Sequence, residues 1–351
     1  MDETLDLLTL ALLPEVGPRA VRDLRARGTA AAVLGSPGDG PDLLPARAAS
    51  LLRSGEARRR AEEEMRRAVA LGIRIVGLGD EDYPAFLRQI YDPPPVLYVR
   101  GKLRGDEGPW SLAIVGSRAA SPQGTALAQR MARELAAGGA TVVSGLARGI
   151  DTAAHKGALA AGGRTVAVLG AALDCLYPRE NEALASAIAD RGAVVSEFPL
   201  GTPPAPGHFP RRNRILAGWG RGVVVVEAAL RSGALVTARL ALDEGREVLA
   251  VPGHPSHAGA GGTNQLIVDG APLVRDATDV ARELGLPAPA VAGQGAGVDA
   301  VLDALRPGAP ASIEEIRERS GRPTSELLVR LTELEMAEKV RRLPGPLYLR
   351  P

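Results

Sequence analysis

Short runs of apolar residues alternate with longer amphipathic segments over most of the chain, beginning at Ile73. The apolar runs occupy residues 112–116, 141–144, 165–170, 193–196, 222–227 and 247–252. Segments with helical spacing lie between them, at 123–137, 151–161, 181–191 and 233–244. Strands that are apolar nearly throughout are typical of a parallel sheet with helices on both faces. The alternation therefore predicts a doubly wound, mostly parallel α/β domain.

The residues before this domain are rich in leucine at helical spacing and then reach the turn Pro-Glu-Val-Gly-Pro at 14–18. This predicts a helical module over 1–70, similar to a SAM-like or helix-hairpin-helix unit. In such a turn glycine permits a tight bend, and exposed backbone N–H groups can meet a phosphate. A packing module without DNA contact remains equally open, because residues 1–111 carry 16 basic and 17 acidic residues.

The residues after the α/β pattern divide into two segments. Residues 287–297 are rich in Pro, Ala and Gly, which predicts a flexible linker. Short helices are then predicted at 298–305, 313–319 and 324–335, and a hairpin at 339–342 and 347–349. Three helices and a hairpin predict a winged helix over 298–351. The α/β domain itself is predicted to cover 71–286 as an extended Rossmann-like domain.

The bulk composition is that of an ordinary globular protein, with 45% hydrophobic residues, 24% charged residues and a net charge of +1. Cys175 is the one cysteine, which excludes a disulfide framework and the Cys/His spacing of a zinc site. We therefore expect no metal and no cofactor. The N-terminus has no basic region before its apolar residues, and no apolar run reaches membrane-spanning length. These observations predict a cytoplasmic protein without a membrane partner.

One basic cluster departs from this balance, the segment Phe-Pro-Arg-Arg-Asn-Arg at 209–214. No acidic residue occurs between Leu200 and Val226, so nothing nearby in the sequence neutralises its arginines. A single-stranded nucleic acid requires such a combination, because the ring can stack on a base while guanidinium groups pair with phosphates. A surface loop whose arginines pair with distant carboxylates is the alternative interpretation.

Glycines and basic residues also follow four of the predicted strands. The carboxyl ends of parallel strands meet at one edge of the sheet, and backbone N–H groups at glycine turns favour anions there. Each glycine alone is explained by a tight turn, but four such loops at one edge favour a phosphate site. The predicted DNA-binding residues are Gly116, Ser117, Arg118, Gly145, Arg148, Gly149, Arg179, Phe209, Arg211, Arg212, Asn213, Arg214, Ser232 and Gly233.

The motifs of nucleotide-dependent catalysis are absent from the sequence. The first strand ends Gly-Ser-Arg rather than in a Gly-x-Gly-x-x-Gly fingerprint, and no phosphate loop with Gly-Lys-Ser/Thr occurs. Asp151 and His155 share a helical face and could act as an orienting carboxylate and a base. Asp151 is more simply the cap of its helix, which leaves His155 as a packing residue or a DNA contact. We therefore predict no catalytic residue.

The strand ends and the basic cluster resemble, in this order, the DNA-processing protein A family (DprA, also called Smf). The matching stretches are AIVGSR (113–118), SGLARGIDTAAHKGAL (144–159), GRTVAVL (163–169), LDCLYPREN (173–181), SEFP (196–199), FPRRNRILA (209–217), VVEA (225–228), SGALVTA (232–238) and GREVLAVPG (245–253), preceded by DPPPVLYVRG (92–101). The match covers the α/β domain and is highly specific, whereas the flanking domains match weakly.

The resemblance implies a non-enzymatic protein that binds and protects single-stranded DNA, forms dimers and loads the RecA recombinase during natural transformation. It also implies that Arg118 and Arg179 line the DNA pocket, that Phe209 stacks on a base, and that residues 211–214 line the groove. The implied dimer surface consists of Leu266, Ile267 and Leu273. Relatives often have lysine where this chain has arginine, which also binds phosphate.

Two other classes of protein remain as alternatives. A nucleotide-processing enzyme of the phosphoribohydrolase type uses a Pro-Gly-Gly-x-Gly-Thr loop, to which Gly-Gly-Thr at 261–263 is the nearest string. A regulator would use the winged helix to bind duplex DNA. Residues 298–351 carry nine basic and nine acidic residues, and this neutral balance disfavours a helix that enters a DNA groove.

Overall fold

The computed structural model describes residues 3–25, 28, 30, 34, 44–289, 300–336 and 339–351. The chain divides into two compact units, residues 1–290 and 291–351. No helix within the described ranges is long and apolar enough to cross a membrane.

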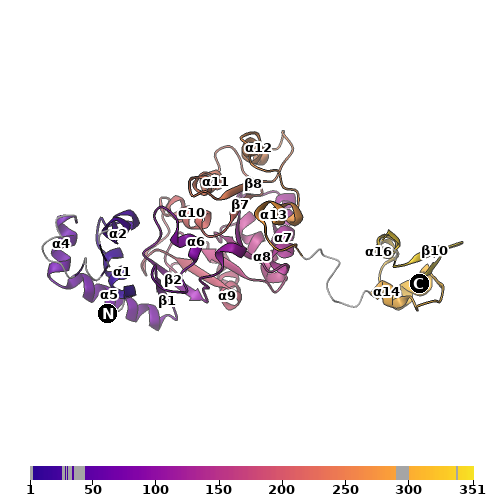
Figure 1. Ribbon diagram of the computed structural model, residues 1–351, viewed down its shortest axis with the longest axis horizontal. Helices are drawn as coiled ribbons and strands as arrows, with labels where there is room; N and C mark the ends of the chain where they lie inside the picture. Colours follow the sequence, from indigo (N-terminus) through magenta and orange to yellow (C-terminus); the bar gives the residue numbers. More distant parts are fainter. Residues whose placement is uncertain are drawn as a thin grey trace. The chain divides into compact units, whose positions relative to one another are not determined.

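An eight-stranded sheet forms the centre of the first unit (Figure 1). Its strands are β1 (Arg74–Gly77), β2 (Val96–Gly101), β3 (Ser111–Val115), β4 (Thr141–Ser144), β5 (Thr165–Val168), β6 (Ala193–Ser196), β7 (Gly222–Val225) and β8 (Glu247–Ala250). Their order across the sheet is β1-β2-β6-β5-β4-β3-β7-β8. The six strands β3–β8 are parallel, which confirms the predicted Rossmann-like arrangement. The antiparallel strands β1 and β2 extend it at one edge.

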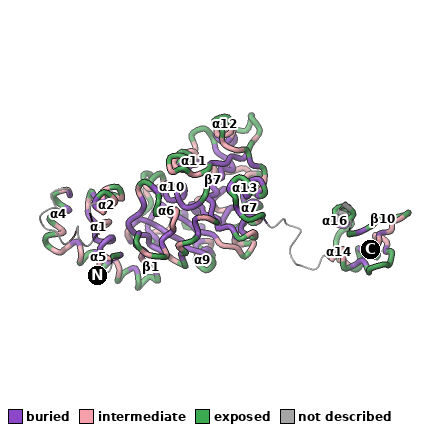
Figure 2. The backbone as a smooth tube through the Cα atoms, viewed as in Figure 1, coloured by how far each residue is buried: buried purple, intermediate pink, exposed green. Residues whose placement is uncertain are grey.

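Helices cover both faces of this sheet, and the strand residues alternate between two apolar clusters. Leu112 and Ile114 of β3 pack in a cluster with α7 (Pro122–Ala137), α8 (Ile150–Ala160) and α13 (Ala277–Leu284). Ala113 and Val115 pack in the cluster that includes α10 (His208–Gly218) and α11 (Gly233–Asp243). Both sets are almost completely buried (Figure 2), which explains why the strands are apolar throughout. The helices after β2 are α7 (Pro122–Ala137), α8 (Ile150–Ala160), α9 (Glu182–Arg191), α10 (His208–Gly218), α11 (Gly233–Asp243), α12 (Gly261–Val268) and α13 (Ala277–Leu284).

Helices also precede the sheet, as the leucine spacing predicted. They are α1 (Glu3–Ala11), α2 (Pro18–Arg25), α4 (Ala46–Arg53), α5 (Glu56–Ala70) and, between β1 and β2, α6 (Ala85–Arg88). Leu7, Leu8 and Leu10 of α1 are fully buried in the cluster that continues into the sheet. In the turn between α1 and α2, Glu15 has a positive φ of 64°, whereas the glycine of this turn does not.

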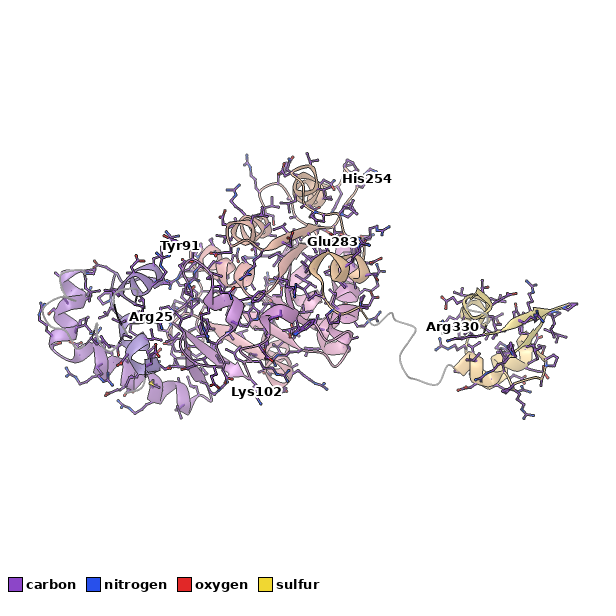
Figure 3. All side chains as sticks on the ribbon, viewed as in Figure 1. Arg25, Tyr91, Lys102, His254, Glu283 and Arg330 are labelled. Atoms are coloured by element: carbon purple, nitrogen blue, oxygen red, sulfur yellow. The ribbon has the colours of Figure 1, made fainter. Side chains whose placement is uncertain are left out.

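Hydrogen bonds tie these N-terminal helices to the rest of the unit at Tyr91, which Figure 3 labels. The guanidinium of Arg22 in α2 donates to the carbonyl of Tyr91 at 2.6 Å and lies 4.0 Å from the centre of its ring. The Tyr91 N–H donates to the carboxylate of Glu244, at the end of α11, at 3.0 Å. A domain boundary at residue 70 therefore stays a prediction, since the structure packs both sides of it together.

The second unit has the elements predicted for a winged helix. They are α14 (Ala300–Ala304), β9 (Ala311–Ser312), α15 (Ile313–Ser320), α16 (Thr324–Met336), β10 (Arg341–Leu343) and β11 (Leu347–Leu349). The hairpin β10–β11 pairs with β9, and Ile316, Leu327 and Tyr348 lie in the small core. Residues 290–297 of the predicted linker lie outside the described residues.

Candidate nucleic-acid interface

The loops at the carboxyl ends of β3, β4 and β7 meet above the centre of the sheet. β3 lies between β4 and β7 in the sheet. The chain goes from β3 to β4 on one side, and reaches β7 on the other side only after it has formed β5 and β6. Open α/β sheets bind ligands in the crevice at such a point. A cavity of about 710 Å³ opens here. Eight predicted residues line it: Gly116, Ser117, Arg118, Phe209, Arg212, Asn213, Ser232 and Gly233.

The glycines of these loops have different tasks. A side chain at Gly116 would lie 2.6 Å from Ile150, and Gly149 has a φ of +71° and would overlap the carbonyl of Ser117. These two positions let the loops after β3 and β4 pack on each other. Gly233, by contrast, begins α11 with nothing within 4 Å of where a side chain would stand. A ligand backbone can therefore approach the start of this helix closely.

Arg212 is the most unusual charge of the site. It is only 3% exposed, and its guanidinium donates to the carbonyl of Val168 at the end of β5. No acidic side chain forms an ion pair with it within the described residues, and its Nε has no hydrogen-bond partner there. Burial lowers the pKa of Arg212 to about 10, an effect that Asp151 opposes and Arg118 reinforces. The guanidinium thus remains charged at neutral pH and lines the cavity, where the carboxylate of Asp151 acts on it electrostatically without forming an ion pair among the described residues.

Gly145 makes room for this guanidinium. A methyl group at Gly145 would overlap the terminal nitrogen atoms of Arg212. The next residue, Leu146, is fully buried and has a φ of 56°. A non-glycine residue in this left-handed region stores strain, and such strain clusters at functional sites. The loop after β4 is therefore shaped around the Arg212 side chain.

Two aromatic rings stand at the mouth of the site. The guanidinium of Arg118 lies 4.8 Å from the centre of the Phe209 ring, and the ring of Tyr177 lies 6.1 Å from it at an angle of 56°. Both rings, with Arg118 and Arg148, line a second cavity of about 250 Å³ next to the first. Tyr177 is 45% exposed and was missed as a site residue. Its position in the loop between β5 and α9, beside a proline, was the available signal.

Three further arginines of the predicted set lie at the surface around these cavities, in addition to Arg231, which lines the larger one. Arg148 pairs with Glu180 through two contacts of 2.6 and 2.7 Å. Arg179 is exposed and lines neither cavity. Arg211 contacts the ring of Phe198 and pairs with Glu197 at 3.0 Å, on the side of α10 away from Arg212. Their charges are available to a long ligand but are not gathered at the cavity floor.

Arg214 lines neither cavity. Its side chain is 7% exposed and pairs with Glu197 at 2.8 Å and with Asp92 at 3.2 Å. The expectation that no acidic residue neutralises the cluster is therefore wrong for Arg211 and Arg214, because these acids come from other loops. Asn213 remains in the cavity wall, where its side-chain amide donates to the carbonyl of Gly233 at 3.4 Å.

The Asp151 and His155 pair has no arrangement for catalysis. The cap position of α8 is Gly149, so the predicted capping role of Asp151 is wrong; its carboxylate lies in the first turn and accepts from the N–H of Ala147 at 3.3 Å. His155 is fully buried against Thr165, with 2.7 Å between Nδ1 and Oγ1. Burial lowers the pKa of His155 to about 3. It is a neutral packing residue and faces away from solvent.

The residues predicted for a dimer surface lie around α12. Leu266 and Ile267 are half-buried, Leu273 is 44% exposed, and Val268 beside them is 79% exposed. Leu230, 65% exposed, lies close to the start of α12 at Gly261. Exposed apolar patches of this kind mark interaction sites. Contact between two copies stays a prediction.

Comparison with known proteins decides what kind of protein has this cavity. The family model described as DNA recombination-mediator protein A matches residues 74–285, and the DprA winged helix domain model matches residues 286–346. The chain belongs to the DNA recombination-mediator protein A family. Protein Smf of Escherichia coli is 39% identical over 295 residues, which are 77% of this chain and 76% of that protein. The predicted DprA/Smf resemblance is thus confirmed.

Solved structures of DprA proteins agree with this membership. DprA from Streptococcus pneumoniae superposes with a TM-score of 0.69 and 34% identity, over 81% of this chain and 98% of that chain. DNA processing protein A from Helicobacter pylori, whose structure addresses its single-stranded DNA binding mode, has a TM-score of 0.55 and 30% identity, over 60% and 95% of the two chains. Within the described residues, no three His, Cys, Asp or Glu side chains gather to hold a metal ion.

Proposed function

We propose that this chain is a recombination mediator that binds and protects single-stranded DNA at the two cavities and loads RecA during natural transformation. The observation that carries the proposal is Arg212, a buried guanidinium that no acidic side chain ion-pairs among the described residues and that lines an open cavity together with Phe209. A phosphate supplies the missing charge. The single-stranded DNA binding of the Helicobacter pylori relative supports this choice of ligand.

The shape of the site favours a single strand over a duplex. Phe209 and Tyr177 offer their faces to bases that are already unstacked, whereas the bases of a duplex stack on one another and cannot reach them. Phe209 takes one base, and Arg118 next to its ring takes the adjoining phosphate. The start of α11 offers the backbone N–H of Gly233 to a further phosphate, since the N–H groups of Ser232 and Ala234 donate to the carbonyl of Ala229 and to the Ser232 hydroxyl.

The predicted set of contacts is therefore refined. We propose direct contacts from Arg118, Tyr177, Phe209, Arg212, Asn213 and the start of α11, and outer contacts from Arg148, Arg179 and Arg211. Gly116, Gly145 and Gly149 shape the loops, as their tight surroundings indicate. No catalytic role is proposed. Dimerisation through α12 and the RecA partnership rest on the family resemblance, and the cytoplasmic location rests on the sequence. All three stay predictions.

Fluorescence anisotropy with matched single- and double-stranded oligonucleotides over a salt series tests the proposal. We expect tighter binding to the single strand, and Arg118→Ala or Arg212→Ala should weaken it and reduce the salt slope by about 0.7 for each lost phosphate contact. The matched control is Arg239→Ala, an exposed arginine on α11 that lines neither cavity.

The other outcomes each point to a different class of protein. Preference for duplex that disappears when residues 298–351 are removed would assign the function to the winged helix. Failure to bind either form at low salt would refute a nucleic-acid site, and release of free base from nucleoside monophosphates would then identify the enzyme alternative.

A further inference from the structure

The sheet has an open edge at β1, far from the DNA cavity. β1 pairs with β2 alone, and Figure 1 shows no strand beyond it. The N–H of Leu78 donates to the carbonyl of Pro95 at 2.9 Å, directly beyond the last paired residues of β1. In an antiparallel pair every second residue bonds to the neighbour. Residues 74, 76 and 78 therefore face β2, and residues 75 and 77 face outward.

One outward position remains free for a new partner. The N–H of Gly77 is taken by the carboxylate of Asp80 at 2.8 Å. No hydrogen bond from Ile75 to any group outside the β1–β2 ladder occurs in the described part of the chain. Ile75 therefore presents an N–H and a carbonyl at the edge. Proteins usually protect such groups with lysine, proline or a bulge at the edge strand.

A groove of about 740 Å³ runs beside this edge. Its apolar wall comes from Met65, Ala68 and Val69 of α5, and Val69 is 75% exposed. Its other wall is acidic, with Asp80, Glu81 and Asp82 against a single basic residue, Arg74. Arg74 pairs with Asp82 at 3.1 Å, and Asp80 bonds to Gly77, whereas Glu81 has no ion pair among the described residues.

We propose that this groove binds an extended basic segment of a partner protein, which adds to β1 as a further strand. Backbone groups of the segment would pair with Ile75, while its alternate side chains would enter the apolar wall and meet Glu81. The acidic rim selects a basic partner by charge complementarity. β2, β6 and β5 separate β1 from β4, so the partner leaves the DNA cavity open. The inference thus stands independently of the proposed DNA binding.

Binding of a short fluorescent peptide that alternates lysine and valine to the full chain tests this proposal. We expect the same peptide with glutamate in place of lysine to bind about tenfold or more weakly. Ile75→Pro should also lower affinity about tenfold, because proline removes the outward N–H without removing a ladder bond. Val69→Asp should weaken binding, whereas the matched control Val329→Asp, also at an exposed valine, should not.

Charge reversal provides a readout that does not depend on how Ile75→Pro folds. Glu81→Lys should weaken the lysine peptide and strengthen the glutamate peptide. Equal binding of both peptides to the wild type, or unchanged affinity in folded Ile75→Pro, overturns strand addition by a basic segment. A dimer in sedimentation velocity that Ile75→Pro abolishes would also overturn it, because a second copy would then occupy the edge. The DNA-binding assay is unaffected in either case.

Discussion

Replacing Arg214 with alanine tests whether neighbouring arginines of α10 have separate tasks. Arg214 connects α10 to Glu197 and Asp92, and its side chain is 7% exposed. Arg212, two residues earlier, faces the cavity. If this division is right, Arg214→Ala lowers the free energy of unfolding and leaves DNA affinity unchanged.

The size of the effect follows from what the substitution leaves behind. Removing one partner of a buried ion pair costs about 3–5 kcal/mol because the other charge stays buried. Glu197 keeps its contact with Arg211 at 3.0 Å, and Asp92 keeps a contact of 3.6 Å with Arg19. We therefore expect the lower end, about 3 kcal/mol. At about 2 °C per kcal/mol for a unit of this size, the melting temperature should fall by about 6 °C.

Thermal unfolding and anisotropy on the same protein samples provide the measurement. The expected result is a lower melting temperature with a dissociation constant and salt slope equal to those of the wild type, below the melting transition. Arg212→Ala is the contrasting variant, since it should lose affinity and salt slope. An Arg214→Ala protein that melts like the wild type but loses salt slope would refute the assignment and return Arg214 to the DNA site.

Substitutions at three other positions test the site and the interior. Gly145→Ala places a methyl group on the guanidinium of Arg212, so single-stranded DNA affinity measured by anisotropy should fall about as far as in Arg212→Ala. Tyr177→Ala should lower the affinity for single-stranded DNA about fivefold or more, since stacking is worth ~1–3 kcal/mol per base, whereas Tyr177→Phe should retain it. Equal losses of affinity in the two variants would show that the ring does not stack on a base. Burial holds the pKa of His155 at about 3, against about 6.5 when unfolded. As the pH falls below 6.5, the unfolded chain binds a proton that the folded chain does not bind. The stability that neutral His155 contributes is therefore complete above pH 6.5 and is lost as the pH falls. From pH 6.5 to 5 the free energy of unfolding should fall by about 2 kcal/mol for this reason. In denaturant titrations at the two pH values, His155→Asn should show a smaller fall.

The parallel part of the fold was predictable because burial on both faces leaves a local signal in each strand. The predicted run 222–227 extends past β7, which ends at Val225. Glu227 is buried like the strand residues, but it lies in the loop after β7, where its carboxylate accepts from the hydroxyl of Ser121 at the start of α7. The pairing of β1 and β2 with the same sheet was not predicted. It depends on contacts with β6, about a hundred residues further on, and no local pattern specifies them.

The site was predictable where single residues or loops determine it, and not where distant residues meet. Arg118, Phe209 and Arg212 were chosen correctly as neighbours because the strand ends converge. The neutralisation of Arg214 could not be seen, since an acid-free window says nothing about Glu197 and Asp92 arriving from other loops. The depth of Arg212 was equally hidden, because it depends on the space left by Gly145 in the loop after β4.

The lone charge of Arg212 also connects occupancy to the lifetime of the protein. Taking a guanidinium out of water without an ion-pair partner costs folding free energy, so the empty protein is less stable than its packing would allow. A bound strand stabilises the folded protein by RT ln(1 + [L]/Kd), which includes the charge that it supplies to Arg212. Unoccupied copies should therefore be degraded first by proteases that act on unfolded chains. The amount of this protein in a cell would then follow the amount of its ligand.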